Sequence, residues 1–162
     1  MVMPKQKPGR SEQVVCTPVE FLAAVKKRLG IEGYGFGLDL AASHANAVAG
    51  NYYTEEDDSL IQSWHGANAR GTWSWCNPPY ADLRPWVAKA HFEASQGAMV
   101  AMLVAASVGS EWWREFVDGS AYVTFFGPRL TFVGHTSPYP KDLALLLYAP
   151  FLRGGSTIWR WK

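Results

Sequence analysis

The order of apolar and polar positions predicts helices and strands that alternate along the first two thirds of the chain. Apolar residues recur on one helical face, and Gly30 is a suitable C-terminal stop, so we expect a helix over 18–29. Just before it, Thr17-Pro18-Val19-Glu20 has the form of a capping box with proline at the first helical position. We therefore expect the Thr17 side chain to cap this helix.

The later segments follow the same two periods, with strands predicted from short apolar or alternating runs and helices from longer amphipathic ones. Glycine and proline mark several boundaries, as at Gly119 and at the two prolines after Asn77. The expected elements are a strand within 35–42, a brief helix from Ser43 to near Gly50, a strand at 51–54, a strand at 73–76, a helix at 84–96, a strand at 98–104, a helix at 110–118, and strands at 121–126, 129–133, 143–149 and 156–161.

This succession predicts an α/β fold with a mostly parallel sheet and an antiparallel C-terminal edge. The continuous apolar run from Ala98 to Val104 is typical of a parallel strand that is covered on both faces. The 162 residues fit one domain. We expect a flexible basic arm at 1–15 and a single domain over 16–162, since no internal repeat or interdomain linker is visible.

The composition indicates the cellular compartment of the protein more clearly than its function. The formal net charge is only +1, so any surface for a polyanion must be a local patch. Cys16 and Cys76 form no disulfide or metal-binding pattern, which favours a reduced intracellular compartment. The N-terminus lacks the apolar segment of a secretory signal, and the longest apolar run, 98–106, is too short to span a bilayer. We therefore expect a cytoplasmic protein without a membrane role.

Asn77-Pro78-Pro79-Tyr80, directly after the strand expected at 73–76, is the motif with the most definite chemistry. The amino group of adenine is a poor nucleophile because its lone pair is delocalised into the ring. The Asn77 side-chain oxygen and the Pro78 carbonyl can accept its two N–H bonds, the prolines hold these acceptors in place, and Tyr80 offers a stacking face. A base inside a duplex cannot reach such a site and must be flipped out. We expect no metal, because the four histidines share no ligand spacing.

Beyond the tetrapeptide, a string of short matches over about residues 16–150 resembles the small phage-type DNA N6-adenine methyltransferases. The chain departs from the pattern at Ala41 to Ser43, where many methyltransferases have glycines, and at Pro128, which interrupts a Gly-Arg-Leu pattern. The matching stretches are Thr17-Pro18, Leu38-Asp39-Leu40-Ala41-Ala42-Ser43 with Asn46, Tyr53-Thr54-Glu55-Glu56-Asp57-Asp58-Ser59-Leu60, Trp64, Cys76-Asn77-Pro78-Pro79-Tyr80 with Trp86, and Gly127-Pro128-Arg129-Leu130-Thr131-Phe132.

The resemblance implies a Rossmann-like methyltransferase sheet and S-adenosyl-L-methionine as the cofactor. It places Asp39 at the end of the first strand, near the methionine part of the cofactor, with Ala41 and Ser43 in the following loop and Thr17 nearby. By the same resemblance, Glu55 binds the ribose hydroxyls and Asp58 accepts from the adenine amino group of the cofactor. It also implies a phage or prophage protein that acts in the host cytoplasm.

Double-stranded DNA is the implied partner. We expect no separate target-recognition domain, and therefore either a short target or a homodimer on a symmetric one. Phosphate contacts are expected from loops near the strand ends, with Arg70, Arg84, Arg129 and Lys141 as candidates beside Lys5, Lys7 and Arg10 of the arm.

Other interpretations of the tetrapeptide stay open. It is compatible with a strand-to-loop turn that carries an incidental tyrosine, although its place between an aromatic-rich strand and a helix favours a site. The same chemistry serves a glutamine side-chain amide in proteins, whereas enzymes acting on N4 of cytosine tend to have serine or aspartate in the position of Asn77. A different class is a catalytically inactive nucleic-acid-binding domain that has kept the fold.

Overall fold

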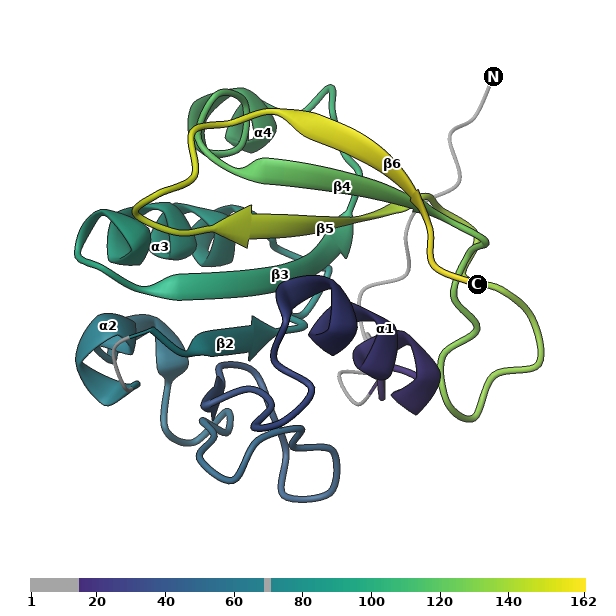
Figure 1. The fold of residues 1–162 in the computed structure, drawn as a ribbon, viewed down its shortest axis with the longest axis horizontal. Helices are drawn as coiled ribbons and strands as arrows, with labels where there is room; N and C mark the ends of the chain where they lie inside the picture. The colour runs from purple at the N-terminus through teal and green to yellow at the C-terminus, as the bar shows by residue number, and fades with distance from the viewer. Residues whose placement is uncertain (1–14, 69–70) are drawn as a thin grey trace.

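The computed structural model describes residues 15–68 and 71–162, which form one mixed sheet with helices on both faces (Figure 1). Apart from Val15, the expected arm at 1–15 lies outside the described residues, as does Arg70. The helices are α1 Val19–Leu29, the 3-10 turn η1 Ser59–Ile61, α2 Trp64–Ala67, α3 Arg84–Ser95 and α4 Glu111–Phe116, and the strands are β1 Leu38–Asp39, β2 Trp73–Cys76, β3 Met99–Ala105, β4 Tyr122–Gly127, β5 Leu143–Tyr148 and β6 Ser156–Arg160.

The strands lie side by side in the order β1-β2-β3-β5-β4-β6. The first three run parallel, β5 is antiparallel to both β3 and β4, and β6 runs parallel to β4. The expected mostly parallel α/β sheet is thus confirmed. The antiparallel strand comes from the C-terminal part, as expected, and it lies between β3 and β4 rather than at the border of the sheet.

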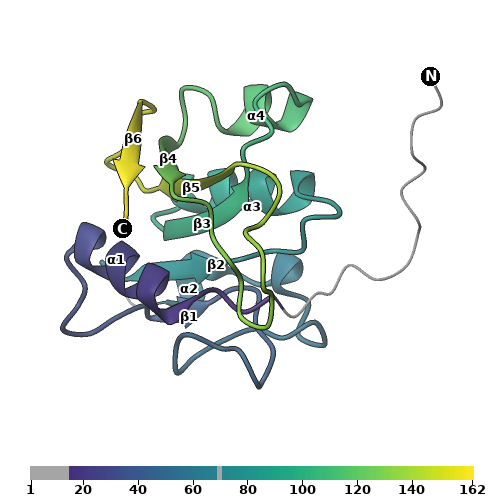
Figure 2. The ribbon, with the colours of Figure 1, turned by 90° about the vertical axis from the view of Figure 1, so that its right-hand side faces the viewer.

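Helices cover the two faces unequally, with α1 on one face and α3 and α4 on the other (Figure 2). On the α1 face, Phe21 packs against Phe126 of β4 and against Trp159 and Trp161 in and after β6, with ring centroids 4.7–5.9 Å apart. On the opposite face, Trp113 of α4 stacks on Phe125 of β4. Alternation of side chains along β4 therefore serves both layers of the core.

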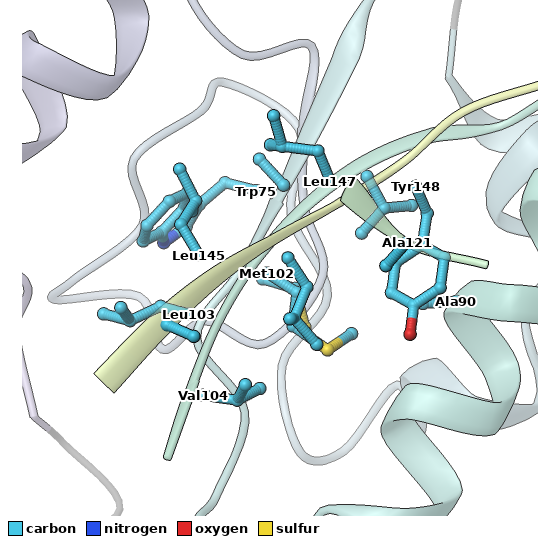
Figure 3. Packing of buried hydrophobic residues seen from close by; sticks show 14 of the residues in the cluster. Trp75, Ala90, Met102, Leu103, Val104, Ala121, Leu145, Leu147 and Tyr148 are labelled. Atoms are coloured by element: carbon cyan, nitrogen blue, oxygen red, sulfur yellow. The ribbon is translucent and has the colours of Figure 1, made fainter. Parts of the chain in front are cut away.

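The core is centred on β3 and β5, whose side chains are almost all buried. Figure 3 shows Leu103 and Leu145 on the side that faces α1, and Met102 and Tyr148 on the side of Ala90 in α3. The Tyr148 hydroxyl donates to the Phe116 carbonyl at 2.7 Å, so the polar end of this buried ring is satisfied. A strand covered on both faces must be apolar throughout, and this is why the run at 98–104 was readable from the sequence.

Most predicted elements are confirmed within a few residues. The strand at 73–76 matches β2, which ends at Cys76 just before the tetrapeptide. Gly30 ends α1 in the left-handed conformation, and its N–H reaches the carbonyls of Lys26 and Lys27. The helix expected at 110–118 forms as α4, with the Ser110 side chain accepting from the Trp113 N–H as its cap.

Four expectations about local structure are wrong. Residues 129–133 form no strand, because the chain leaves the sheet after Gly127 and runs through a long loop to β5. The brief helix expected from Ser43 is only a turn, and the strand expected at 51–54 is a single bridge from Tyr52 to Asp39. The capping box also does not form: α1 begins at Val19, and Pro18 is the N-cap residue, with no side-chain cap.

Candidate active site

The topology gathers the predicted polar residues at one edge of the sheet. Because β1, β2 and β3 are parallel, their carboxyl ends meet at this edge, where ligands of open α/β sheets bind. Asp39 is the last residue of β1, and Asn77 follows the last residue of β2. Asp39 lies beside Trp75, two residues before Asn77. The structure therefore brings the expected cofactor carboxylate and the expected catalytic amide to neighbouring strand ends.

Asp39 is buried, with 3% of its surface exposed, and its carboxylate shapes the loop that follows. One oxygen accepts from the Ala41 N–H at 3.2 Å and the other from the Val48 N–H at 3.0 Å. Burial raises the pKa of Asp39, and these two backbone donors offset part of that rise. A cationic ligand group beside this carboxyl would favour its charged form and would interact with it strongly, because little water screens the pair.

The loop after β1 carries Ala41 and Ser43 in place of glycines. It is closed by Asn46, whose side-chain oxygen accepts from the Ser43 N–H at 2.6 Å. The Ser43 hydroxyl is buried and has no hydrogen-bond partner among the described residues. A buried hydroxyl without a partner is costly unless a ligand satisfies it, so this atom is a candidate ligand contact.

The chain before the acidic turn, residues 51–53, lies beside β1 on the side away from β2, and the acidic turn at 54–58 follows it. Backbone hydrogen bonds join Asn51 and Tyr53 to Asp39, both at 2.9 Å, and so carry the chain past the end of β1 into the turn at 54–58. Within the turn, one carboxylate oxygen of Asp57 accepts from both the N–H and the hydroxyl of Thr54, at 2.7 and 2.8 Å. These bonds, the backbone one first, lower the pKa of Asp57.

The same turn leaves Glu55 and Asp58 exposed to solvent. Asp58 adopts a left-handed conformation with φ of 47°, which aspartate tolerates better than most residues, and it starts η1. Sequence matches marked Glu55 and Asp58 as ligand contacts, whereas the structure assigns Asp57 to the turn itself. Asp57 is thus the one acid of 55–58 whose carboxylate is engaged within the turn.

The Asn77 side chain is held by two residues that precede α1. Its Nδ2 donates to the Val15 carbonyl at 3.1 Å and to the Thr17 hydroxyl oxygen at 3.3 Å. Both partners belong to the segment that leads into α1. Because the amide nitrogen faces this segment, the Oδ1 acceptor at the other end of the planar amide points away from it.

Tyr80 lies against an aromatic residue that the sequence interpretation did not include. Its ring meets Tyr139 edge to face at 5.7 Å, and Tyr139 meets Phe132 in the same way at 5.7 Å. Both partners come from the loop at 128–142, which therefore folds over the tetrapeptide. No sequence signal marks Tyr139, since it stands between two prolines in a segment without periodicity.

The phenol of Tyr80 is held neutral. Burial raises its pKa well above the ordinary value, and the nearby Tyr139 and Cys76 add to the rise. Its hydroxyl is buried without a hydrogen-bond partner among the described residues. The Cys76 thiol is fully buried, and burial first and the Asp39 charge second raise its pKa as well. Neither group is therefore suited to act as a base near neutral pH.

Two of the expected DNA-binding cations are already paired within the protein. Arg84 forms an ion pair with Glu115 and lies over the Phe116 ring at 5.4 Å. Arg129 pairs with Asp142 at 3.0 Å and donates to the Pro140 carbonyl at 3.2 Å. Each guanidinium remains about half exposed and can still approach a phosphate. Lys141 is exposed beside Asp142 in the loop at 128–142.

Comparison with known proteins gives a consistent result. A family model described as DNA N-6-adenine-methyltransferase (Dam) matches residues 7–143. A DNA N-6-adenine-methyltransferase of Escherichia phage T1 is 30% identical over 115 residues, which cover 71% of this chain and 45% of that protein. One of Haemophilus phage HP1 is 26% identical over 128 residues, covering 75% of this chain and 71% of the relative. The chain thus spans less than half the length of the phage T1 protein.

A solved structure also shares a general likeness. It is a predicted O-methyltransferase from Agrobacterium tumefaciens, with a TM-score of 0.40 and 12% identity, covering 76% of this chain and 77% of the other. At this distance the likeness supports no statement about the site. In the part of the chain that the structure describes, no helix is long and apolar enough to cross a membrane.

Proposed function

The chain belongs to the DNA N-6-adenine-methyltransferase (Dam) family, and we propose that it transfers a methyl group from S-adenosyl-L-methionine to N6 of adenine in double-stranded DNA. The observation that carries this proposal is the Asn77 side chain, whose amide nitrogen is engaged by Val15 and Thr17. Its oxygen is thereby kept as an acceptor at the carboxyl edge of the sheet. A fixed acceptor for an N–H bond is what an amino substrate requires.

The residues at the end of β1 suit a bound S-adenosyl-L-methionine. This cofactor carries a positively charged sulfonium and an α-ammonium group, and Asp39 offers a buried negative charge. The unpartnered Ser43 hydroxyl can bond the polar end of the methionine part, and Ala41 supplies loop backbone beside it. Glu55 is proposed to bind the ribose hydroxyls of the cofactor and Asp58 its adenine amino group. The cofactor supplies an electrophilic methyl group, and no phosphate has to be cradled.

The tetrapeptide then acts on the amino group of the target base. Asn77 Oδ1 and the Pro78 carbonyl accept its two N–H bonds, which favours a pyramidal nitrogen with an available lone pair. Pro79 restricts the backbone that carries these groups, and Tyr80 packs against the base. The nitrogen gains the methyl group, the sulfonium becomes a thioether, and the extra proton on the nitrogen leaves to solvent. No strong protein base is needed for that last step.

DNA is proposed to approach over the loop at 128–142. This loop carries Arg129 and Lys141, and its Tyr139 ring contacts Tyr80. The candidate phosphate contacts and a neighbour of the tetrapeptide therefore lie on one loop. Arg84 at the start of α3 is a further candidate. Because a duplex buries its amino groups in base pairs, the target adenine has to be flipped out of the stack. A homodimer on a symmetric target remains part of the proposal, as does a cytoplasmic setting in a phage-infected cell.

The test is methylation of duplex DNA by the purified protein with S-adenosyl-L-methionine, followed by nucleoside mass spectrometry. N6-methyladenine is the expected product. A protein mixture rich in glutamine side chains is offered in parallel under the same conditions. Methylation of the protein mixture without methylation of the DNA would contradict the proposal and indicate a glutamine methyltransferase. Failure to bind the cofactor at all, measured by calorimetry, would instead favour an inactive nucleic-acid-binding domain.

A further inference from the structure

The segment Val15 to Thr17 makes contacts that a simple lead into a helix does not require. Val15 and Thr17 both accept from the Asn77 amide, and the Cys16 carbonyl between them accepts from the Val133 N–H at 3.1 Å. The segment is therefore held between the tetrapeptide after β2 and the loop at 128–142. Thr17 is buried, with 8% of its surface exposed.

The Thr17 hydroxyl is free to serve Asn77 because it does not cap α1. In a capping box the threonine oxygen would accept from a backbone N–H in the first turn. Here Pro18 is the N-cap residue and no side-chain cap is present, so the hydroxyl oxygen is directed to Asn77 Nδ2 instead. Thr17 thus binds the Asn77 amide, whereas its sequence pattern predicts a helix cap.

The Val15 carbonyl decides which way round the Asn77 amide lies. A carbonyl oxygen can only accept, so the Val15 carbonyl admits the NH2 end of the amide and rejects the oxygen end. Thr17 provides a second acceptor for the same nitrogen and leaves Oδ1 on the opposite side. With the amide reversed, an NH2 group would face the amino group of the target base, and two donors would meet. Only one of the two orientations can accept an N–H bond from the base.

We propose that Thr17 is a positioning residue that, beside the orienting Val15 carbonyl, holds the Asn77 amide in place with Oδ1 directed toward the substrate amino group. This role rests on the proposed function, because it assigns Asn77 to the substrate. It differs from the cofactor contact that the sequence resemblance implied for Thr17. The difference is measurable: a positioning residue affects turnover through Asn77, whereas a cofactor contact affects the affinity for S-adenosyl-L-methionine.

The kinetic test compares Thr17→Val, which keeps the shape and removes the acceptor, with Thr17→Ser, which keeps the hydroxyl. Loss of one hydrogen bond that fixes the reactive geometry should lower the turnover number of Thr17→Val about tenfold. Thr17→Ser should recover most of that loss. Both variants should bind S-adenosyl-L-methionine as the wild type does in a calorimetric titration. Thr157→Val makes the same chemical change on β6 and serves as the control.

A second measurement does not depend on activity. The side-chain NH2 signal of Asn77 is assigned in a nitrogen-15 spectrum by its absence in Asn77→Ala. Its hydrogens should exchange with solvent more rapidly in Thr17→Val than in the wild type, and Thr17→Ser should resemble the wild type. Unchanged exchange in Thr17→Val would show that the hydroxyl does not hold the amide, and the proposal would be wrong.

The outcomes separate this inference from the proposed function. If the wild-type protein forms no N6-methyladenine, the proposed function fails, and the amide exchange then decides the Thr17 contact by itself. If the wild type is active but Thr17→Val and Thr17→Ser turn over equally, Thr17 does not position Asn77. A Thr17→Val variant with weakened cofactor binding and normal turnover at saturating cofactor would assign Thr17 to the cofactor and overturn the proposal.

Discussion

Two regions at the carboxyl edge of the sheet are built by opposite means. Asn77 is fixed by Val15 and Thr17, which lie 62 and 60 residues away in the sequence. The acidic turn is fixed by Asp57 and Thr54, which lie three residues apart. The first arrangement exists only when the segment before α1 meets the end of β2, and the second is closed within a few residues.

The difference between long-range and local contacts agrees with the role of each region in the proposed reaction. Methyl transfer depends on the direction of a lone pair, so its acceptor must be held to a fraction of an ångström and a few degrees. Two hydrogen bonds from a segment that is distant in the sequence supply this restraint on the Asn77 amide. Recognition of ribose hydroxyls by exposed carboxylates tolerates more movement, and a turn that holds its own shape is sufficient for it.

The largest expected effect is at the tetrapeptide. Asn77→Ala should lower the turnover number by roughly a hundredfold to a thousandfold, as loss of one fixed hydrogen-bonding group does in other enzymes. Cofactor affinity should stay nearly unchanged, because the contacts proposed for the cofactor lie at the end of β1. Single-turnover methylation and a calorimetric titration measure the two quantities separately. Substantial turnover in this variant would show that Asn77 takes no part in methyl transfer, and the firm hold on its amide would then have no catalytic purpose.

The next effect is expected at Asp39. Asp39→Ala removes a buried charge and the acceptor for the Ala41 and Val48 N–H groups, so the loop after β1 loses its anchor. Cofactor affinity should fall by about tenfold to a hundredfold, the range that follows from losing charged hydrogen bonds. The calorimetric titration that serves Asn77→Ala measures it directly. Unchanged affinity would show that the end of β1 is not the cofactor site.

The exposed Asp82 provides a matched control for this change. Asp82→Ala removes a carboxylate from the surface just after Tyr80 and leaves the Asp39 contacts in the loop after β1 in place. Its cofactor affinity should equal that of the wild type. A loss as large as that of Asp39→Ala would point to a general effect of negative charge rather than to the built site at β1.

The same contrast explains how far the sequence could be interpreted. The parallel strands, α3, α4 and the tetrapeptide at the end of β2 follow from local patterns, and the structure confirms these elements. Asn77 was placed at a strand end because a strand boundary is itself a local signal, whereas Asp39 was placed at one by the resemblance to the methyltransferase family. Within the acidic turn, the bond between Thr54 and Asp57 spans three residues, yet the sequence alone did not separate Asp57 from its acidic neighbours.

What the sequence missed depends on contacts across the chain. The pattern around Thr17 predicts a helix cap, since nothing nearby shows that Asn77 will lie next to the hydroxyl. Tyr139 belongs to a loop without periodicity, and only the folding of that loop over Tyr80 gives it a place in the site. The strand expected at 129–133 has suitable residues, but the chain leaves the sheet after Gly127 and these residues belong to the loop at 128–142.

A third prediction concerns a long-range contact that has no part in the proposed chemistry. Glu93 of α3 is buried and accepts from the backbone and ring nitrogen of His65 at 3.0 and 2.6 Å, while Lys89 lies 2.7 Å from its other oxygen. Burial alone would raise the pKa of Glu93, but these contacts outweigh it and lower the pKa. The group thus tethers the start of α2 to α3.

Glu93→Gln should lower the free energy of unfolding at neutral pH by about 1–3 kcal/mol, the usual cost of losing charged hydrogen bonds at a buried site. Because the folded-state pKa is depressed, the stabilisation by Glu93 is complete above its unfolded value of 4.5 and is lost as pH falls through the folded value. The gap between variant and wild type should therefore shrink in denaturant titrations at increasingly acidic pH. A gap that persisted at low pH would mean that the charge is not what holds the tether.

The smallest effect is expected in the acidic turn. Asp57→Ala removes the acceptor of both Thr54 donors, but the turn is exposed and its neighbours remain joined to β1 through Tyr53. Cofactor affinity should fall only a few-fold, with no measurable change in thermal stability, and Glu56→Ala, which changes an equally exposed acid, should have no effect on either. Calorimetry and thermal unfolding give the two readouts. A loss of affinity as large as that of Asp39→Ala would mean that Asp57 touches the cofactor itself, and the local turn would then be as much a part of the binding site as the buried end of β1.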